Sequence, residues 1–229
     1  MSADLSQSLS QSPSSTSDYH ALFASPIEAD NIAAMEPNAW LTNSCIRILI
    51  HTYSTPTTSN TTPRINFVDP DWLATWQYSY APLPTTPSFF SHLGPQRLQG
   101  LAIPFNVNNY HWVTLYINLE ARGVLLFDSA HSLLAESQAR EVCSRFFSVF
   151  EEFFWKIGNG VQPRFRFEVD DKCAQQQDGS SCGLYAVRNC LDLLDRRRPS
   201  GVALTEDEIA NARRNGRVVL RQKWKAQAG

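Results

Sequence analysis

The sequence has no long apolar segment. No uninterrupted apolar run reaches the roughly 20 residues that a helix needs to span a bilayer. The amino terminus also lacks the basic start and apolar stretch of a secretory signal. We therefore expect a chain that is neither inserted into a membrane nor exported.

The chain also has no large excess of charge of either sign. Its 20 Lys and Arg residues and 22 Asp and Glu residues give a formal net charge of -2. Proteins that bind nucleic acids or anionic membranes through their overall field carry a strong positive charge, so we expect neither as a partner. With 43% hydrophobic and 18% charged residues, the composition is typical of a globular protein. We expect a monomer.

The number and spacing of the cysteines argue against two kinds of site. The five cysteines form an odd number without dense spacing, which argues against a disulfide framework. A zinc site through Cys173, Cys182 and Cys190 would lack any Cys-x-x-Cys pair. We therefore expect no metal and no cofactor. We also expect a reducing compartment, the nucleus or the cytoplasm, in which a thiol stays free.

The order of the predicted elements, helices then strands then helices, favours one α+β domain. Residues 1–18 are rich in Ser and Gln and poor in core-forming side chains, so we predict a disordered tail followed by a domain over residues 19–229. Residues 40–50 predict a short buried helix, with a strand as the alternative. A polar loop rich in Thr, Ser and Pro follows Tyr53, and the Asp-Pro-Asp segment at residues 69–71 predicts the start of another helix.

The centre of the sequence predicts the strands of a sheet, and helices are predicted before and after these strands. Alternating or continuous apolar patterns indicate strands at residues 101–105, 112–119, 124–127 and 164–169. An amphipathic pattern predicts a helix over residues 132–157. A stripe of leucine and valine after Cys182 predicts a helix that ends before Pro199, and a capping box at residues 205–208 begins a last, basic helix.

Cys182 is the cysteine that the sequence favours as a nucleophile. It lies where a glycine-containing loop meets the start of a helix, and unpaired N–H groups and the helix dipole stabilise a thiolate there. Gly183 next to it has no side chain, which leaves room for a substrate backbone. A cysteine on its own is more often a small buried hydrophobe, and Cys45, Cys143 and Cys190 keep that interpretation.

Three further residues supply the other groups that a thiol hydrolase needs. His111 precedes the first central strand and Asp128 follows the return strand, so a hairpin brings a base and an orienting carboxylate together. Gln176 lies six positions before Cys182, where its amide can donate to an oxyanion beside the Cys182 N–H. Each residue alone has an ordinary structural explanation, and three consecutive glutamines leave the choice of donor open. Together the four residues indicate a cysteine hydrolase.

These motifs closely resemble those of the SUMO protease family, the cysteine proteases that process ubiquitin-like modifiers, to which the adenovirus maturation protease is distantly related. The resemblance rests on a His-Trp pair at 111–112, an Asp-Ser pair at 128–129, a Gln-rich loop ending in Cys-Gly at 173–183, and a Trp-Leu pair at 40–41. It implies a circularly permuted papain-like α+β fold with the catalytic order His, Asp, Cys. A mixed or antiparallel central sheet would be flanked by helices.

The resemblance also implies a reaction. Trp112 and Trp40 would flank a narrow tunnel that admits only a Gly-Gly tail, although core packing is the alternative for both. The chain would then be a thiol isopeptidase or endopeptidase that cleaves after the C-terminal Gly-Gly of a ubiquitin-like modifier. SUMO is the modifier that we expect, and cleavage would release it from conjugates or mature its precursor. It departs from the family pattern at three places: Ser181 replaces an aspartate, Ala174 replaces a proline, and residues 42–44 replace a more acidic segment.

Several alternatives stay open on the sequence. A deubiquitinase or a protease for another ubiquitin-like modifier would carry the same motifs. An acyltransferase on the same scaffold would need a basic pocket for an anionic cofactor, and a silent binding module would hold all four groups in an unproductive geometry. A chymotrypsin-like viral protease is nearly all β, which the helical stripe after Cys182 disfavours.

Overall fold

The computed structural model describes four stretches of the chain, residues 27–54, 64–70, 98–154 and 165–228. Three predictions lie outside them: the Ser/Gln-rich tail, most of the polar loop after Tyr53, and the helix expected after Pro70.

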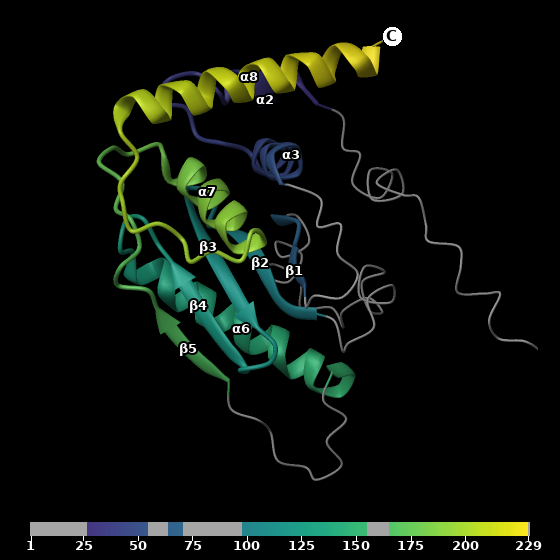
Figure 1. The fold of residues 1–229 in the computed structure, drawn as a ribbon, viewed down its shortest axis with the longest axis vertical. Coiled ribbons are helices and arrows are strands. Elements are labelled where there is room, and N and C mark those ends of the chain that lie inside the picture. Colours follow the sequence, from purple (N-terminus) through teal and green to yellow (C-terminus); the bar gives the residue numbers. More distant parts are fainter. Residues whose placement is uncertain (1–26, 55–63, 71–97, 155–164, 229) are drawn as a thin grey trace, which may run out of the picture.

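A mixed five-stranded sheet forms the middle of the molecule (Figure 1). Its strands lie in sequence order: β1 (Arg64–Phe67), β2 (Leu98–Val107), β3 (His111–Asn118), β4 (Gly123–Phe127) and β5 (Arg166–Val169). The inner strands β2, β3 and β4 are antiparallel, whereas β1 runs parallel to β2 and β5 runs parallel to β4. The four predicted strands are confirmed, and β5 is the half-exposed edge strand that its alternation predicts.

Helices cover both faces of the sheet (Figure 1). α6 (Leu133–Phe154) packs on one face, and α7 (Cys182–Leu194) packs on the other with α3 (Asn43–Tyr53) beside it. α8 (Glu206–Ala228) crosses the end of this second layer and contacts α3 and the short helix α2 (Ala29–Ala33). A mixed sheet between helices is the α+β arrangement that the sequence predicts.

Two helix starts show how local sequence sets the element boundaries. α3 begins at Asn43, after the Trp-Leu pair, because the Thr42 hydroxyl accepts the N–H of Cys45 at 3.3 Å and caps the helix. The helical prediction for this segment is therefore correct, and the strand alternative is wrong. α8 begins with the predicted capping box, in which the N–H of Thr205 donates to the Glu208 carboxylate at 2.8 Å. The N–H of Glu208 donates in return to the Thr205 hydroxyl at 3.2 Å.

β3 is buried on both of its faces. The valine, leucine and isoleucine at its odd-numbered positions pack in one cluster with α6. Trp112 and Tyr116 point to the opposite face and belong to the cluster around α7 and α3. Thr114 lies on the same face, fully buried, and donates its hydroxyl to the Ala186 carbonyl of α7 at 3.3 Å. The sheet therefore separates two cores.

Two hairpins bring the start of β3 and the end of β4 to the same end of the sheet. β2 turns into β3 through Asn108 and Asn109, whose φ angles of 50° and 63° lie in the left-handed region that asparagine tolerates. His111 is the first residue of β3. β4 runs back antiparallel and ends one residue before Asp128. The predicted base and carboxylate are therefore neighbours because of the local topology.

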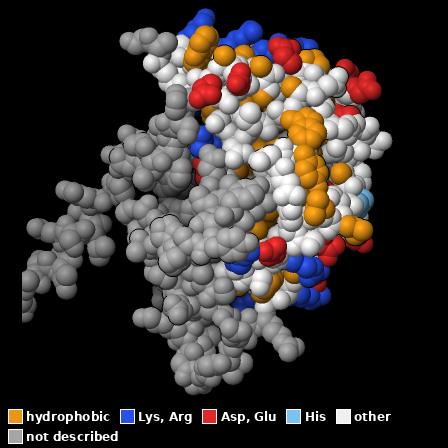
Figure 2. All heavy atoms as spheres, turned by 180° about the vertical axis from the view of Figure 1, so that it is seen from behind, with side chains coloured by type: hydrophobic (Ala, Val, Ile, Leu, Met, Phe, Trp, Pro, Cys, Tyr) orange, Lys and Arg blue, Asp and Glu red, His pale blue; other side chains and the backbone are white. Residues whose placement is uncertain are grey.

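α8 is a long, basic helix of 23 residues. From Arg213 to its end it has no Asp or Glu, and its cations are Arg213, Arg214, Arg217, Arg221, Lys223 and Lys225. Figure 2 shows Lys and Arg side chains along the top of the molecule, where Figure 1 places this helix. In the stretches that the structure describes, no helix is both long and apolar enough to span a membrane.

Candidate active site

His111 and Asp128 form a buried hydrogen-bonded pair at the end of the sheet where β3 begins and β4 ends. The Nε2 atom of His111 lies 2.7 Å from Oδ1 of Asp128. Two backbone N–H groups hold the carboxylate: Ala130 donates to Oδ1 at 2.8 Å, and Ser132 donates to Oδ2 at 2.7 Å. The turn after β4 therefore fixes Asp128 in an orientation that also fixes the imidazole.

The charges around His111 favour its protonated form. Burial alone would lower the pKa of His111, but its hydrogen bonds to Asp128 and Cys182 and the charges of both raise the pKa to about 9. Burial would raise the pKa of Asp128, but the hydrogen bonds from His111 and the Ala130 N–H hold that pKa below its usual range. Since Nε2 faces Asp128, Nδ1 is the ring nitrogen left for Cys182.

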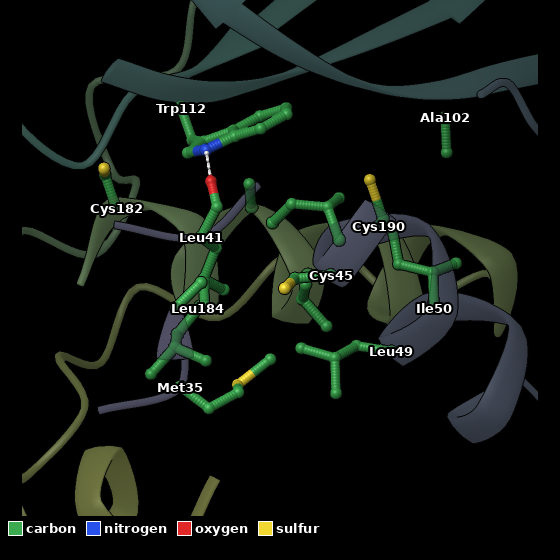
Figure 3. Close-up of a cluster of buried hydrophobic side chains, with 14 of the residues drawn as sticks. Met35, Leu41, Cys45, Leu49, Ile50, Ala102, Trp112, Cys182, Leu184 and Cys190 are labelled. Carbon is green, nitrogen blue, oxygen red and sulfur yellow. Dashed lines mark hydrogen bonds between the residues drawn. The ribbon is translucent and has the colours of Figure 1, made fainter. Parts of the chain in front are cut away.

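Cys182 lies where a loop becomes the helix α7 (Figure 3). It is the first residue of the helix and is buried. The N–H groups of a first helical turn have no acceptor inside the helix, so they and the dipole favour a thiolate at this position. The Asp178 carboxylate shapes the loop, because its Oδ1 accepts the N–H groups of Ser180 and Ser181, each at 2.7 Å. As the first N–H of α7, that of Cys182 has no acceptor within the helix, which suits it to bind an oxyanion.

The other four cysteines are buried thiols of the core. Burial raises the pKa of Cys143 to about 12 and that of Cys173 to about 11, and it raises the pKa of Cys45 and of Cys190 as well. These thiols are therefore protonated at neutral pH, which agrees with their interpretation as small hydrophobes. All five cysteines are free, and among the described residues no three His, Cys, Asp or Glu side chains are placed to hold a metal ion.

The glutamines on either side of Gln176 have structural partners. Gln175 donates its side-chain amide to the carbonyls of Asp128 and Cys173, at 3.1 Å and 2.9 Å. Gln177 is exposed and donates to the Gln175 carbonyl at 3.4 Å. Gln175 thus ties the loop before Cys182 to the end of β4.

Gln176, the glutamine at the predicted spacing, is anchored on Ser129. Its backbone N–H donates to the Ser129 carbonyl at 2.9 Å, and its side-chain oxygen accepts the Ser129 hydroxyl at 2.8 Å. Its amide nitrogen donates to the Asp178 carbonyl at 2.7 Å. An amide nitrogen carries two N–H groups, and the second is the one that we expect to meet an oxyanion. Its role as the donor stays a prediction.

The two tryptophans expected at a substrate tunnel lie in different surroundings. Trp112 is 3% exposed and donates its indole N–H to the Leu41 carbonyl at 2.8 Å (Figure 3). Trp40, the neighbour of Leu41 in the chain, is 46% exposed. Trp112 is therefore a core residue that fixes the segment carrying Trp40. Contact of either indole with a substrate tail stays a prediction.

Gly183 has a packing role that the sequence does not reveal. A Cβ atom at this position would lie 2.9 Å from the Cβ atom of Leu41. The space that the glycine leaves is therefore occupied by Leu41, which lets the segment before α3 approach α7 closely. The packing against Leu41 is a second reason for a glycine at this position, and the predicted substrate contact at Gly183 stays a prediction.

Two charged residues of the nucleophile loop region escape sequence reasoning. Asp178 accepts two N–H groups of the loop, and Arg213 of α8 donates to the Ser180 carbonyl at 3.1 Å. An aspartate before glycine is a common turn signal, so Asp178 had a signal that indicates only a loop. Arg213 is one of several cations in a basic helix, and no pattern in the sequence separates it from the others.

A family of known proteins matches the part of the chain that holds this site. Residues 97–222, more than half of the chain, match the Ulp1 protease family, C-terminal catalytic domain. The chain belongs to the Ulp1 protease family. The resemblance drawn from the sequence motifs is therefore confirmed, and the protein is a cysteine protease. His111, Asp128, Gln176 and Cys182 lie inside the matched range. No curated protein matches the chain significantly.

Solved structures share the fold at low sequence identity. The C-terminal Ulp1 protease domain in complex with Smt3, the yeast orthologue of SUMO, is 16% identical over 85% of this chain and 83% of that one, with a TM-score of 0.59. The Xanthomonas campestris effector XopD bound to ubiquitin is 16% identical over 79% and 92%, with a TM-score of 0.54. The Chaetomium thermophilum Ulp1-like SUMO protease catalytic domain is 18% identical over 82% and 74%, with a TM-score of 0.50. The papain-like α+β fold of this Ulp1-family protease is confirmed.

Proposed function

We propose that this Ulp1-family protease is a thiol isopeptidase or endopeptidase that cleaves after the C-terminal Gly-Gly of a ubiquitin-like modifier, and that the modifier is of the SUMO type. The proposal depends on the hydrogen-bonded pair of His111 and Asp128 beside Cys182 at the start of α7. The structural similarity to Ulp1 solved with Smt3 supports the choice of modifier.

Each predicted catalytic group has a step in this reaction. The sulfur of Cys182 attacks the carbonyl carbon of the terminal glycine, and His111 accepts the thiol proton and gives it to the leaving amine. Asp128 holds the imidazole in orientation throughout. The N–H of Cys182 and the second amide N–H of Gln176 bind the oxyanion. Water then attacks the thioester, His111 takes its proton, and the modifier leaves as the free carboxylate while Cys182 is regenerated.

The segment around Trp40 provides the selectivity for glycine. The hydrogen bond from Trp112 to Leu41 fixes this segment, and the half-exposed indole of Trp40 can lie against an extended Gly-Gly backbone. A residue with a Cβ atom would collide with the indole face, so a modifier that ends in Gly-Ala is expected to be a poorer substrate.

Covalent labelling tests the proposal. Modifiers of the SUMO type, ubiquitin and other ubiquitin-like proteins, each with a C-terminal electrophile, are incubated with the wild type and with Cys182→Ala, and adducts are read by mass. We expect one adduct with the SUMO-type modifier that Cys182→Ala loses completely. Cys190→Ala is the matched control, because it removes a buried thiol from the same helix and should keep the adduct. An adduct that survives in Cys182→Ala would overturn the assignment of the nucleophile.

Ubiquitin is the second candidate, because XopD, which shares the fold, was solved bound to ubiquitin. The same panel decides between the two modifiers. Absence of every adduct from folded protein would favour an acyltransferase or a silent binding module. We also propose that the enzyme works in the nucleus or cytoplasm, since its chemistry requires Cys182 as a reduced thiol.

A further inference from the structure

Arg213 is a buried cation on α8 that faces the loop before Cys182. Arg213 is 4% exposed, and its guanidinium donates to three backbone carbonyls. Nη1 reaches the carbonyls of Ala34 and Glu36, at 3.3 Å and 3.0 Å, just after α2. Nη2 reaches the carbonyl of Ser180 at 3.1 Å. One side chain therefore connects α8, the segment after α2 and the nucleophile loop.

The peptide that joins Ser180 to Ser181 is held from both sides. Its carbonyl accepts the guanidinium of Arg213, and its N–H donates to the Asp178 carboxylate at 2.7 Å. A peptide unit is planar, so a cation on one end and an anion on the other set its orientation. The next peptide unit carries the N–H of Cys182. The contacts of Arg213 and Asp178 to this peptide unit are called the loop clamp. The direction of the Cys182 N–H and of its sulfur therefore depends on the loop clamp.

The charge of Arg213 also acts on the site. Burial lowers the pKa of Arg213, and the charges of Asp178, Cys182 and Cys45 oppose that shift. A guanidinium stays protonated at neutral pH. All three of its hydrogen-bond acceptors are neutral carbonyls, so its positive charge can stabilise negative charge at Cys182 and Asp178.

We propose that Arg213 is a positioning residue for the nucleophile. It orients the loop of residues 178–181 so that the sulfur and the N–H of Cys182 face the scissile carbonyl. The inference deepens the proposed function and rests on it for the identity of the substrate. It assigns to α8, which contributes none of the predicted catalytic residues, a part in the geometry of catalysis.

Arg217, one turn further along α8, is the matched control. It donates to the Met35 carbonyl at 3.2 Å and pairs with the Glu36 carboxylate at 2.8 Å. It therefore holds the same segment after α2 as Arg213 does, without the contact to Ser180. Loss of Arg217 weakens the attachment of α8 and leaves the loop clamp in place.

The test compares Arg213→Met, Arg213→Lys and Arg217→Met. Turnover is followed with SUMO and with ubiquitin carrying C-terminal aminomethylcoumarin, and modifier binding is measured with each substitution combined with Cys182→Ala. We expect Arg213→Met to lower kcat by about tenfold to a hundredfold, the scale of a misplaced reacting group, with binding unchanged. Arg213→Lys should restore part of kcat, because an ammonium can hold the Ser180 carbonyl with one N–H. Arg217→Met should keep kcat within about twofold, as a residue outside the clamp.

Alkylation of Cys182 by iodoacetamide, followed by mass, is the second readout. It needs no modifier, so it tests the positioning even where the proposed substrate is wrong, and a wild type that turns over neither substrate would count against the proposed function alone. We expect slower alkylation in Arg213→Met and not in Arg217→Met. Circular dichroism checks whether each variant is folded. If Arg213→Met does not fold, Arg213→Lys is used for the test in its place. Equal rates for wild type and the folded Arg213 variants, or equal losses in the Arg213 and Arg217 variants, would overturn the proposal.

Discussion

The two faces of the sheet bury different kinds of side chain. On the α6 face the core is formed by apolar residues, and its one thiol, Cys143, has its pKa raised by burial alone. On the α7 face polar groups are buried among the apolar ones, among them Thr114, Asn31 and Arg213. The predicted nucleophile lies at the end of this second face.

The polar groups of the α7 face fix backbone segments that the apolar contacts alone would leave free to shift. Trp112 holds the Leu41 carbonyl, Thr114 holds the Ala186 carbonyl of α7, and Arg213 holds the carbonyl of Ser180. Burial of apolar surface is not directional, whereas a buried hydrogen bond fixes a position. The α6 face therefore provides stability, whereas the α7 face provides stability and also fixes the positions of backbone segments near Cys182.

Among the substitutions that test the difference between the two faces, Asp128→Asn is expected to have the largest effect on turnover. It removes the charge beside His111 and presents the wrong imidazole tautomer, so kcat should fall by about 100-fold to 10,000-fold. Turnover of the coumarin substrate measures the loss.

Asp170→Asn is the control for that variant. Asp170 is a buried carboxylate at the end of β5, held by Arg198 at 2.9 Å and by the Lys172 N–H at 2.9 Å. Its loss should lower the free energy of unfolding and leave kcat unchanged. A loss of kcat as large as that of Asp128→Asn would show that any carboxylate at this end of the sheet has the same effect.

An intermediate effect is expected from pH. The pKa of His111 is raised to about 9, above its ordinary value of about 6.5. The pairing therefore stabilises the fold fully below about pH 6.5, and this contribution is lost as the pH rises through about 9. The lowered pKa of Asp128 has the opposite sense, since its contribution is present above its ordinary pKa and is lost only as the pH falls through the lower value.

Activity should show the same alkaline limit. We expect kcat/KM to fall above about pH 9, because the imidazolium that protonates the leaving amine is lost. In Asp128→Asn the limit should move to lower pH, as the partner that raises the pKa of His111 is gone. Profiles of kcat/KM against pH for both proteins check this, and a limit at the same pH in both would contradict the assignment.

The smallest effect on turnover is expected from a substitution on the α6 face. One substitution on each face tests whether the two faces differ in this way. Phe146→Ala removes a fully buried ring and should cost about 3–5 kcal/mol of unfolding free energy with kcat per folded enzyme unchanged. Trp112→Phe leaves the Leu41 carbonyl unpaired and should cost only about 1–3 kcal/mol, yet lower kcat/KM. Urea unfolding and active-site titration measure both. A lower kcat in Phe146→Ala would show that the two faces do not differ in this way.

Local patterns in the sequence predicted the parts of the site that lie close together in the chain. The alternation of β3 and the return strand β4 placed His111 beside Asp128, because a hairpin needs only its own residues to set the register. The start of α7 followed from the apolar stripe after Cys182. The capping box of α8 was equally local.

The parts that the sequence did not predict depend on contacts between distant segments. Arg213 lies 33 residues from Ser180 and more than 170 from Ala34 and Glu36, and its burial follows from how α8 packs against α2 and α3. Gly183 packs against Leu41, which lies far earlier in the sequence. The carboxylate that holds the loop is Asp178, although the family resemblance directed attention to Ser181.

The hydrogen bond from Arg213 to Ser180 also has a consequence for synthesis of the chain. The ribosome adds residues in order, so His111, Asp128 and Cys182 are all made before α8. Until α8 has emerged and packed, the loop before Cys182 lacks the cation that orients it. A nascent chain therefore contains all the predicted catalytic residues before the cation that orients the loop next to Cys182 has been made.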